Sequence, residues 1–404
     1  MSQELALSAR RDITKKLAAE YTKAGKVEKG EILDALVKAT GWHRDHARRA
    51  LRLASQRKGA AWQQQRKPAA KGYSYDARVV LQEVWHLSGE PCGKYLAVVM
   101  DDMLGRLMRF NELGRVGGRV TDDVLSELRS MSGATIDRYL APHKKAMYPA
   151  ASLSGTRPSL ILRSSIQVRT SMDPFPDTGG LLELDTVAHC GWSLKGDFCY
   201  TLSATDPVYG WTMLRAVKNK AFANVHPALD WVREHAPYTV TAMDFDNGSE
   251  FINWAVVAWA DSHGITLTRG RPYQHNDNAH VEQRNGDWVR KHAFRYRYET
   301  PEELNLLNQL WDLVMARKNH LLPCVKATGW ATTESGRKKR VYDTPATPYQ
   351  RIINAGILNA NTAAKLAAEH AKLDPAKITR QINTIQQRLI ALAAYRTQTG
   401  RQAA

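Results

Sequence analysis

Three acidic residues in the second half of the chain have the types and spacing of a metal site. Asp185 lies within LLELDTV, an apolar run in which an unpaired carboxylate would be costly. Asp246 belongs to MDFDNGSEF, and 35 residues separate it from Glu282. Carboxylate oxygens suit Mg²⁺, and a pair of such ions can drive phosphodiester chemistry. The combination therefore predicts a two-metal site, although MDFDNGSEF alone is a weak signal.

The elements expected around these residues would bring them together. Strands are expected in LLELDTVAH, DFCYTLSATD, WTMLRAV, YTVTAMDFD and ITLTRGR, with a turn between the second and third at Asp206–Gly210. Helices are expected in NKAFANVHPALDWVREH, SEFINWAVVAWADSHG and from AHVEQRNGDWVRKH onward. Three strands followed by alternating helix and strand predict a mixed α/β sheet. The three carboxylates would then meet at one end of it.

Several stretches resemble the DDE transposases of bacterial insertion sequences, whose catalytic core is of the retroviral-integrase type. The matching stretches are LLELDTV, DNGSEF and RPYQHNDNAHVEQRN, with PATPYQRII at 345–353 further downstream. The resemblance covers roughly residues 170–353. It implies an RNase H-like fold in which Asp185, Asp246 and Glu282 are catalytic and bind two Mg²⁺ ions, with Mn²⁺ as a substitute. On the residues alone Asp244 competes with Asp246, and the DNGxEF pattern of the family favours Asp246.

The charge of the chain favours a nucleic-acid partner. It has 57 Lys and Arg against 40 Asp and Glu, a net charge of +17 and a pI near 9.7. Residues 1–72 hold 17 of these basic residues and 7 of the acidic ones. So basic a chain usually binds a polyanion, and solubility alone is the alternative.

Two segments predict helix-turn-helix modules. In KGEILDALVKATGWHRDHARRALRLAS a helix closes at Gly41 and a second one begins near Trp42. The DNA contacts predicted on the second helix are Arg44, Arg48, Arg49 and Arg52. The alternative is an αα-hairpin with a solvated basic face. VTDDVLSELRSMSGATIDRYLAPHKKA predicts a second module, with Thr121 as N-cap, a turn at Ser132-Gly133, and Pro142 as its end.

Further DNA contacts are predicted beside the carboxylates. They are Arg269, Arg271, Tyr273, Asn278 and Arg284. A charged rim that is simply solvated is the alternative for the arginines, and helix capping is the alternative for Asn278.

The predicted architecture is multidomain. A helix-turn-helix domain is expected at 1–55, a basic linker at 56–75 and a helical region with the second module at 76–150. An RNase H-like α/β core with a mixed five-stranded sheet is expected at 170–300, and a basic and helical region at 301–404. Within that last region, 317–341 reads as a loop-rich basic stretch that either grips DNA or connects elements. The tail from 361 reads as an amphipathic helix pair that packs on another subunit or on its own core.

Other classes of protein are disfavoured. The cysteines at 92, 190, 199 and 324 form no CxxC pair, so neither a structural zinc site nor a disulfide framework is expected. No apolar signal region opens the chain, and Asp101 and Asp102 interrupt the best apolar run, so no membrane span is expected. We therefore expect a cytoplasmic protein, and the resemblance implies that it is bacterial and associated with the nucleoid when bound.

The resemblance and the residues together predict a DNA transposase. Its partners would be double-stranded DNA, as element ends and as target, and further copies of itself, because two ends must be joined in one event. Water would cleave the element end, and the freed 3′-OH would attack target DNA. The alternatives are a non-catalytic DNA-binding repressor and an RNase H-like nuclease without strand transfer.

Overall fold

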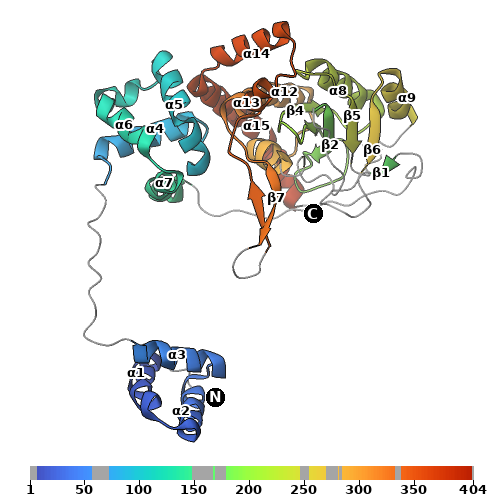
Figure 1. Ribbon diagram of the computed structural model, residues 1–404. Coiled ribbons are helices and arrows are strands. Elements are labelled where there is room, and N and C mark those ends of the chain that lie inside the picture. The colour runs from blue at the N-terminus through green and yellow to red at the C-terminus, as the bar shows by residue number, and fades with distance from the viewer. Residues whose placement is uncertain are drawn as a thin grey trace. The chain divides into compact units, whose positions relative to one another are not determined.

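The computed structural model describes residues 7–56, 72–147, 167–168, 179–245, 254–269, 281, 284–332 and 338–402 (Figure 1). The chain forms two compact units, Met1–Gly72 and Tyr73–Ala404. Among the described helices, none combines the length and the apolar character that crossing a membrane would require.

The first unit is a bundle of α1 (Leu7–Lys23), α2 (Lys26–Thr40) and α3 (Arg44–Gln56). Its small core is formed by Ala18, Leu33, Leu36, Ala47 and Leu51. Gly41 ends α2 with a φ of 69°, and its N–H donates to the carbonyl of Val37. Glycine adopts this left-handed conformation without strain, so the helix, glycine turn and helix predicted here are confirmed.

The second unit begins with five helical elements. They are α4 (Tyr75–Leu87), α5 (Gly93–Arg109), η1 (Gly114–Arg119), α6 (Asp122–Ser130) and α7 (Gly133–Met147). The predicted N-cap of α6 is confirmed, because the Thr121 hydroxyl accepts from the N–H of Val124 at 3.3 Å. At the starts of α5 and α7, Gly93 and Gly133 meet backbone to backbone, which leaves no room for a Cβ at either position.

The prediction that Pro142 ends its helix is wrong, because α7 continues to Met147. A proline inside a helix removes one backbone hydrogen bond. The turn after it is held by other contacts. Lys144 lies 2.9 Å from the Asp137 carboxylate and 5.3 Å from the ring centre of Trp85, whose edge also meets His143. These contacts offset the lost bond.

The second unit contains the predicted mixed sheet. Its strands are β2 (Leu181–Ala188), β3 (Tyr200–Thr205), β4 (Thr212–Val217), β5 (Ala242–Phe245) and β6 (Thr266–Arg269), with the short β1 (Gln167–Val168) at the edge. The order is β1-β6-β5-β2-β3-β4; β2, β3 and β4 are antiparallel, and β1, β6, β5 and β2 are parallel. Two corrections apply within the described residues. The sheet has six strands rather than five, and β5 begins at Ala242, so residues 238–241 are not part of it.

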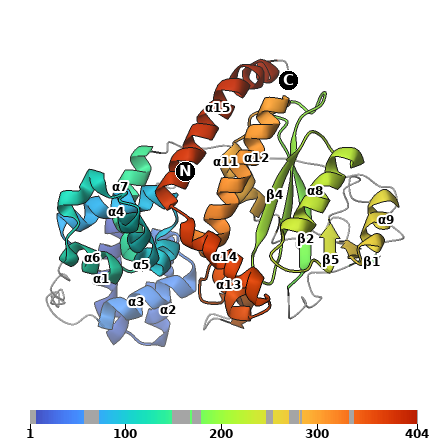
Figure 2. The ribbon, with the colours of Figure 1, turned by 90° about the horizontal axis from the view of Figure 1, so that it is seen from above.

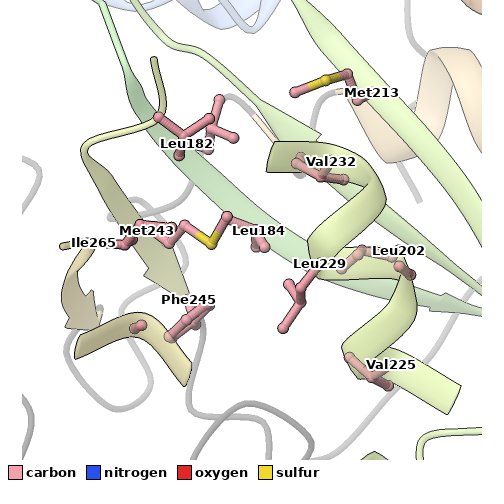
Figure 3. Packing of buried hydrophobic residues seen from close by; sticks show 14 of the residues in the cluster. Leu182, Leu184, Leu202, Met213, Val225, Leu229, Val232, Met243, Phe245 and Ile265 are labelled. Atoms are coloured by element: carbon pink, nitrogen blue, oxygen red, sulfur yellow. The ribbon is translucent and has the colours of Figure 1, made fainter. Parts of the chain in front are cut away.

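Helices cover both faces of this sheet. On one face, α8 (Phe222–His235) and α9 (Trp254–Ser262) pack on Leu182 and Leu184 of β2, and Figure 3 shows Leu184 beside Leu229 of α8. On the other face lie η2 (Asn285–Arg290), α11 (Lys291–Ala293) and α12 (Pro301–Met315), and Val187 of β2 belongs to their core. Because side chains alternate along a strand, Glu183 and Asp185 point to the η2 side with Val187.

The C-terminal region is more ordered than the sequence predicted. After η3 (Ala316–Leu321), the strands β7 (Ala327–Thr332) and β8 (Lys338–Tyr342) form an antiparallel hairpin, so the prediction of a loop-rich stretch is wrong. Next come α13 (Pro348–Ala355), α14 (Ala360–Lys372) and α15 (Pro375–Gln402). The predicted helix pair is confirmed. The apolar side of α15, including Ile382 and Leu389, packs on the chain's own core beside α12 (Figure 2).

Contacts from α14 and α15 tie the helices α4–α7 to the sheet layers. The Arg106 guanidinium, 8% exposed, donates to the carbonyl of His370 at 2.8 Å. The Thr379 hydroxyl donates to the carbonyl of Leu87 and accepts from Arg317 of η3 at 3.0 Å. Buried polar contacts therefore join α4–α7 to the rest of the second unit.

Candidate active site

Asp185 occupies the middle of β2, on the face that η2 covers. It pairs in register with Ser203 of β3, and its side chain is half-buried. One carboxylate oxygen accepts from the N–H of Thr186 at 2.7 Å, and the other accepts from the Asn285 amide at 2.5 Å. Asp185 is thus a carboxylate held from two sides, as a positioned ligand or base requires.

Glu183 makes a second link between β2 and the same helical segment. It is fully buried, and its Oε2 accepts from the N–H of Val281 at 3.1 Å. Val281 and Asn285 therefore both contact β2 at positions two residues apart. Glu282 lies between them in the sequence and is outside the described residues.

On the other side of β2, the last residue pair with β5 is Leu184 with Phe245. The residue after Phe245 is Asp246, which is outside the described residues. Asp244, its competitor as a ligand, is 1% exposed and opposite Glu183. Its carboxylate accepts from the hydroxyl of Thr268 on β6 at 2.5 Å. Asp244 thus joins β5 to β6.

Two buried polar atoms near Asp185 lack partners within the described residues. They are Oδ1 of Asn285 and Oγ of Ser203. Buried oxygens of this kind are costly unless something binds them. Together with the Asp185 carboxylate they form a set of hard oxygen donors, which fits Mg²⁺ or its water ligands. The described residues by themselves contain no cluster of three His, Cys, Asp or Glu side chains suited to a metal.

The predicted DNA contacts of the second unit fall into two groups. Arg271, Tyr273 and Asn278 lie outside the described residues. Arg269 ends β6 and is only 7% exposed. Arg284 is half-buried, with its guanidinium 5.4 Å from the ring centre of Trp288. It lines a hollow together with Gly210, Lys326 and Arg351.

The four predicted contacts of the first unit are all exposed on α3. Arg44 is paired with Asp34, and Arg48 donates to Asp45 at 3.1 Å. Arg49 and Arg52 form no ion pair with any residue that the structure describes. The buried residues of α3, Ala47 and Leu51, lie toward α1 and α2, so the arginines point away from the bundle core.

Two residues of this neighbourhood were missed from the sequence. Glu183 lies two positions before Asp185 and so faces the same way in a strand, which is a signal that could have been used. Asn285 lies three positions after Glu282 and so shares its face in a helix. Neither spacing identifies a partner, because each partner comes from an element distant in sequence.

Two residues near the carboxylates are structural. Asp206 was predicted as a turn residue, and this is confirmed: it is fully buried and accepts from the N–H groups of Gly180, Val208 and Tyr209. Burial nevertheless raises its pKa. The ring of His189 bonds the Thr201 hydroxyl at 2.7 Å, and burial lowers its pKa to about 3, so it is neutral at pH 7.

Comparisons with known proteins add a relative. No model of a protein family matches the chain. Among solved structures, it is similar to the catalytic core domain of BIV integrase, at 18% identity, 44% coverage of this chain, 95% coverage of the other and a TM-score of 0.30. A TM-score this low does not establish a shared fold. The chain is 31% identical over 351 residues to the Sinorhizobium fredii protein named "Uncharacterized protein y4rM", across 87% of this chain and 97% of the relative. The chain therefore belongs to the family of the Sinorhizobium fredii protein y4rM.

Proposed function

We propose that the chain is a DNA transposase that cuts the ends of a mobile element and joins them to target DNA. The observation that carries the proposal is a pair of hydrogen bonds: the Asn285 amide donates to the Asp185 carboxylate, and the Val281 N–H donates to the Glu183 carboxylate. They hold the residues on either side of Glu282 against the strand that carries Asp185. The parallel pairing of β5 with β2 ends one residue before Asp246 and Asp185.

The three proposed ligands would then meet at β2. Asp185 comes from the strand itself, Asp246 directly follows its parallel neighbour, and Glu282 lies within the segment that β2 holds. Asp244 is a poorer candidate, because its carboxylate is buried and bonded to Thr268. Two Mg²⁺ ions, or Mn²⁺, bound by these oxygens would activate the attacking oxygen and stabilise the leaving one.

The reaction needs two in-line displacements at phosphorus. In the first, a water oxygen bonds to the phosphorus at the element end and the bond to the 3′ oxygen breaks, which leaves a 3′-OH and a 5′-phosphate. In the second, that 3′-OH bonds to a phosphorus of target DNA and releases a target 3′-OH. Asn285 would keep the Asp185 carboxylate aimed in both steps, since it bonds one of the two oxygens and leaves lone pairs on each.

DNA recognition would begin in the first unit. The exposed arginines of α3 suit phosphate and base contacts, and the glycine turn between α2 and α3 suits a helix-turn-helix. The second module would be α6 and α7. Because one event joins two element ends, the active form would be a homo-oligomer on DNA.

The test is joining of a labelled flanking-end duplex to plasmid DNA, in Mg²⁺, Mn²⁺ or EDTA. Asp185→Asn, Asp246→Asn and Glu282→Gln are each expected to abolish cleavage and joining while leaving DNA binding intact. Asp261→Asn, which changes an exposed carboxylate on α9, is the matched control and should remain active. Asp244→Asn run beside Asp246→Asn separates the two candidates.

Three outcomes would overturn the proposal in different ways. Full activity of any of the three ligand variants removes that residue from the site. Cleavage without joining points to a nuclease. DNA binding without cleavage in either metal, with verified ends, points to a repressor.

A further inference from the structure

The β7–β8 hairpin exposes large side chains that the proposed chemistry does not use. Trp330 is 65% exposed, Tyr342 49% and Val341 40%. A two-stranded hairpin is only marginally stable by itself. Large apolar side chains exposed together on such a hairpin indicate a surface that binds a partner. In Figure 1 the hairpin extends away from the helices of the C-terminal region.

The hairpin sets a tryptophan on β7 against basic residues on β8. Trp330 pairs in register with Arg340, whose guanidinium lies 5.5 Å from the centre of the indole ring. Lys339 is also exposed. The sequence from 334 to 340 reads ESGRKKR, with four basic residues and one acidic one. Aromatic faces among cations are the composition that binds a nucleic-acid strand, by stacking on bases and pairing with phosphates.

The base of the hairpin is fixed to the core. The backbones of Lys326 and Asp343 bond each other at 2.9 Å, and the Lys326 N–H also donates to the Asp343 carboxylate at 2.7 Å. Arg351 of α13 bonds the other Asp343 oxygen at 2.5 Å and the carbonyl of Cys324 at 2.9 Å. A ligand on the hairpin would therefore be held at a set position relative to the sheet.

That position is next to the candidate active site. Lys326 and Arg351 line the same hollow as Arg284. Arg284 directly precedes Asn285, which donates to Asp185. Basic side chains therefore extend from Arg284, next to Asn285, to Lys326 at the base of the hairpin. Further basic residues follow along β8.

We propose that the hairpin binds the DNA strand beside the phosphodiester that the site cuts. Trp330 stacks on an unpaired base, and Arg340, its register partner, contacts a phosphate. Lys339 lies on the other face of β8 and adds positive charge that attracts the DNA backbone. The six residues of β7 span about 17 Å, which matches about five nucleotides at the spacing of one strand. The proposal rests on the proposed function, and it adds a requirement for unpaired bases next to the cut.

A second copy of the chain is a weaker occupant. In a two-fold contact the same patch lies on both partners, so Lys339 and Arg340 of each copy would face like charges. DNA is complementary to this charge. We therefore assign the surface to DNA.

The test measures, by fluorescence anisotropy, the binding of labelled duplexes to the full chain in EDTA. One duplex is fully paired, and the other has a short run of mismatched bases at one end. Wild-type protein is expected to prefer the mismatched end. Trp330→Ala is expected to weaken that complex about tenfold and to abolish the preference, whereas Trp330→Phe keeps part of it. Lys339→Ala with Arg340→Ala is expected to reduce the slope of log affinity against log salt by about 1.4 to 1.8.

Two matched controls separate this surface from general effects. Trp254 on α9 is 67% exposed, so Trp254→Ala removes an equally exposed indole. Lys365→Ala with Lys372→Ala removes two exposed cations from α14. Both controls should bind both duplexes like wild type.

The outcomes distinguish this proposal from the proposed function. If Trp330→Ala binds both duplexes like wild type, the hairpin proposal is wrong, whether or not the chain cuts DNA. If Trp330→Ala instead changes only the sedimentation of the protein, the hairpin contacts a second copy. If the hairpin variants lose DNA binding as expected but wild type neither cleaves nor joins DNA, the surface stands and the transposase proposal fails.

Discussion

Glu183 contacts the segment of the chain that contains Glu282. Its carboxylate is fully buried and accepts the N–H of Val281, a backbone group at the start of that segment. An unsatisfied buried N–H costs free energy, so the contact fixes where the segment begins. Glu183 is therefore a positioning residue for the proposed ligand next to Val281.

We expect Glu183→Ala to lower the free energy of unfolding by about 1–3 kcal/mol, because it leaves the Val281 N–H without its acceptor. We also expect it to raise the Mg²⁺ concentration needed for half-maximal cleavage. Glu183→Gln keeps an acceptor oxygen of the same reach and should restore most of both quantities. Urea unfolding and a Mg²⁺ titration of cleavage measure the two. If Glu183→Ala lowers the free energy of unfolding but leaves the Mg²⁺ requirement unchanged, Glu183 is a purely structural residue.

Three buried histidines give the second unit a pH-dependent stability. His189, His292 and His320 are 3%, 6% and 7% exposed, and burial lowers the pKa of each to about 3, from 6.5. Between these values the unfolded chain binds protons that the folded chain does not, so stability falls as the pH drops below 6.5. Buried Asp206 acts in the opposite sense, because burial raises its pKa, and desolvation also raises the pKa of Asp312.

At pH 5.5 each of these histidines is expected to cost about 1.4 kcal/mol of stability relative to neutral pH. Urea unfolding at pH 7.5 and 5.5 measures the sum. His320→Gln should make the pH dependence shallower. A pH dependence that His320→Gln leaves unchanged would contradict this account of that imidazole.

At the candidate site the sequence predicted three acidic residues, of which the structure describes Asp185. Asp185 stood out because a carboxylate in an apolar strand needs a partner, and the structure supplies Asn285. The role of Glu183 was not visible, because its partner Val281 is distant in sequence. Arg269 was predicted at a DNA-facing rim and is instead buried, since charge alone does not reveal which strand ends the rest of the chain covers.

At the scale of elements, strong hydrophobic periodicity predicted most helices and strands. It failed where tertiary contacts decide. α7 passes through Pro142 because Lys144 and Trp85 hold the next turn. The β7–β8 hairpin has little apolar alternation, and its exposed strands are fixed at their base by Asp343 and Arg351. β1 has two residues, too few for any periodic signal.

The sequence also did not predict two stretches of π-helix, η2 and η3. η2 and η3 are wider than α-helices, and each is continuous with an α-helix next to it. Such wide turns often occur at functional sites because they re-aim side chains. Asn285 begins η2 and Arg317 lies in η3, so both changes of pitch occur where a buried polar side chain must reach a partner on another element.

At the scale of the whole molecule, each of the two units has its own hydrophobic core. We therefore expect residues 73–404 to fold without the first unit, with an unfolding transition like that of the full chain. The truncated protein lacks the four α3 arginines, so its salt dependence of DNA binding should weaken by up to about 3.6 in slope.

Anisotropy titrations over a range of salt concentrations check this prediction. Replacing the four α3 arginines by alanine in the full chain should reproduce the loss, whereas Lys15→Ala with Lys16→Ala on α1 should cause a smaller one. An unchanged slope in the truncated protein would remove the first unit from DNA recognition.

The contacts of Arg106 and Thr379 have a consequence for the geometry of cutting. They join α4–α7 to the layers that hold Asp185, across chain separations of 264 and 292 residues. If α7 reads bases and the sheet edge cuts a phosphodiester, the two sites belong to one body and are held at a fixed distance from each other. The number of base pairs between a sequence read by α7 and the cut would then be a property of the protein, and adding half a helical turn of DNA between them would place the wrong strand at the metals.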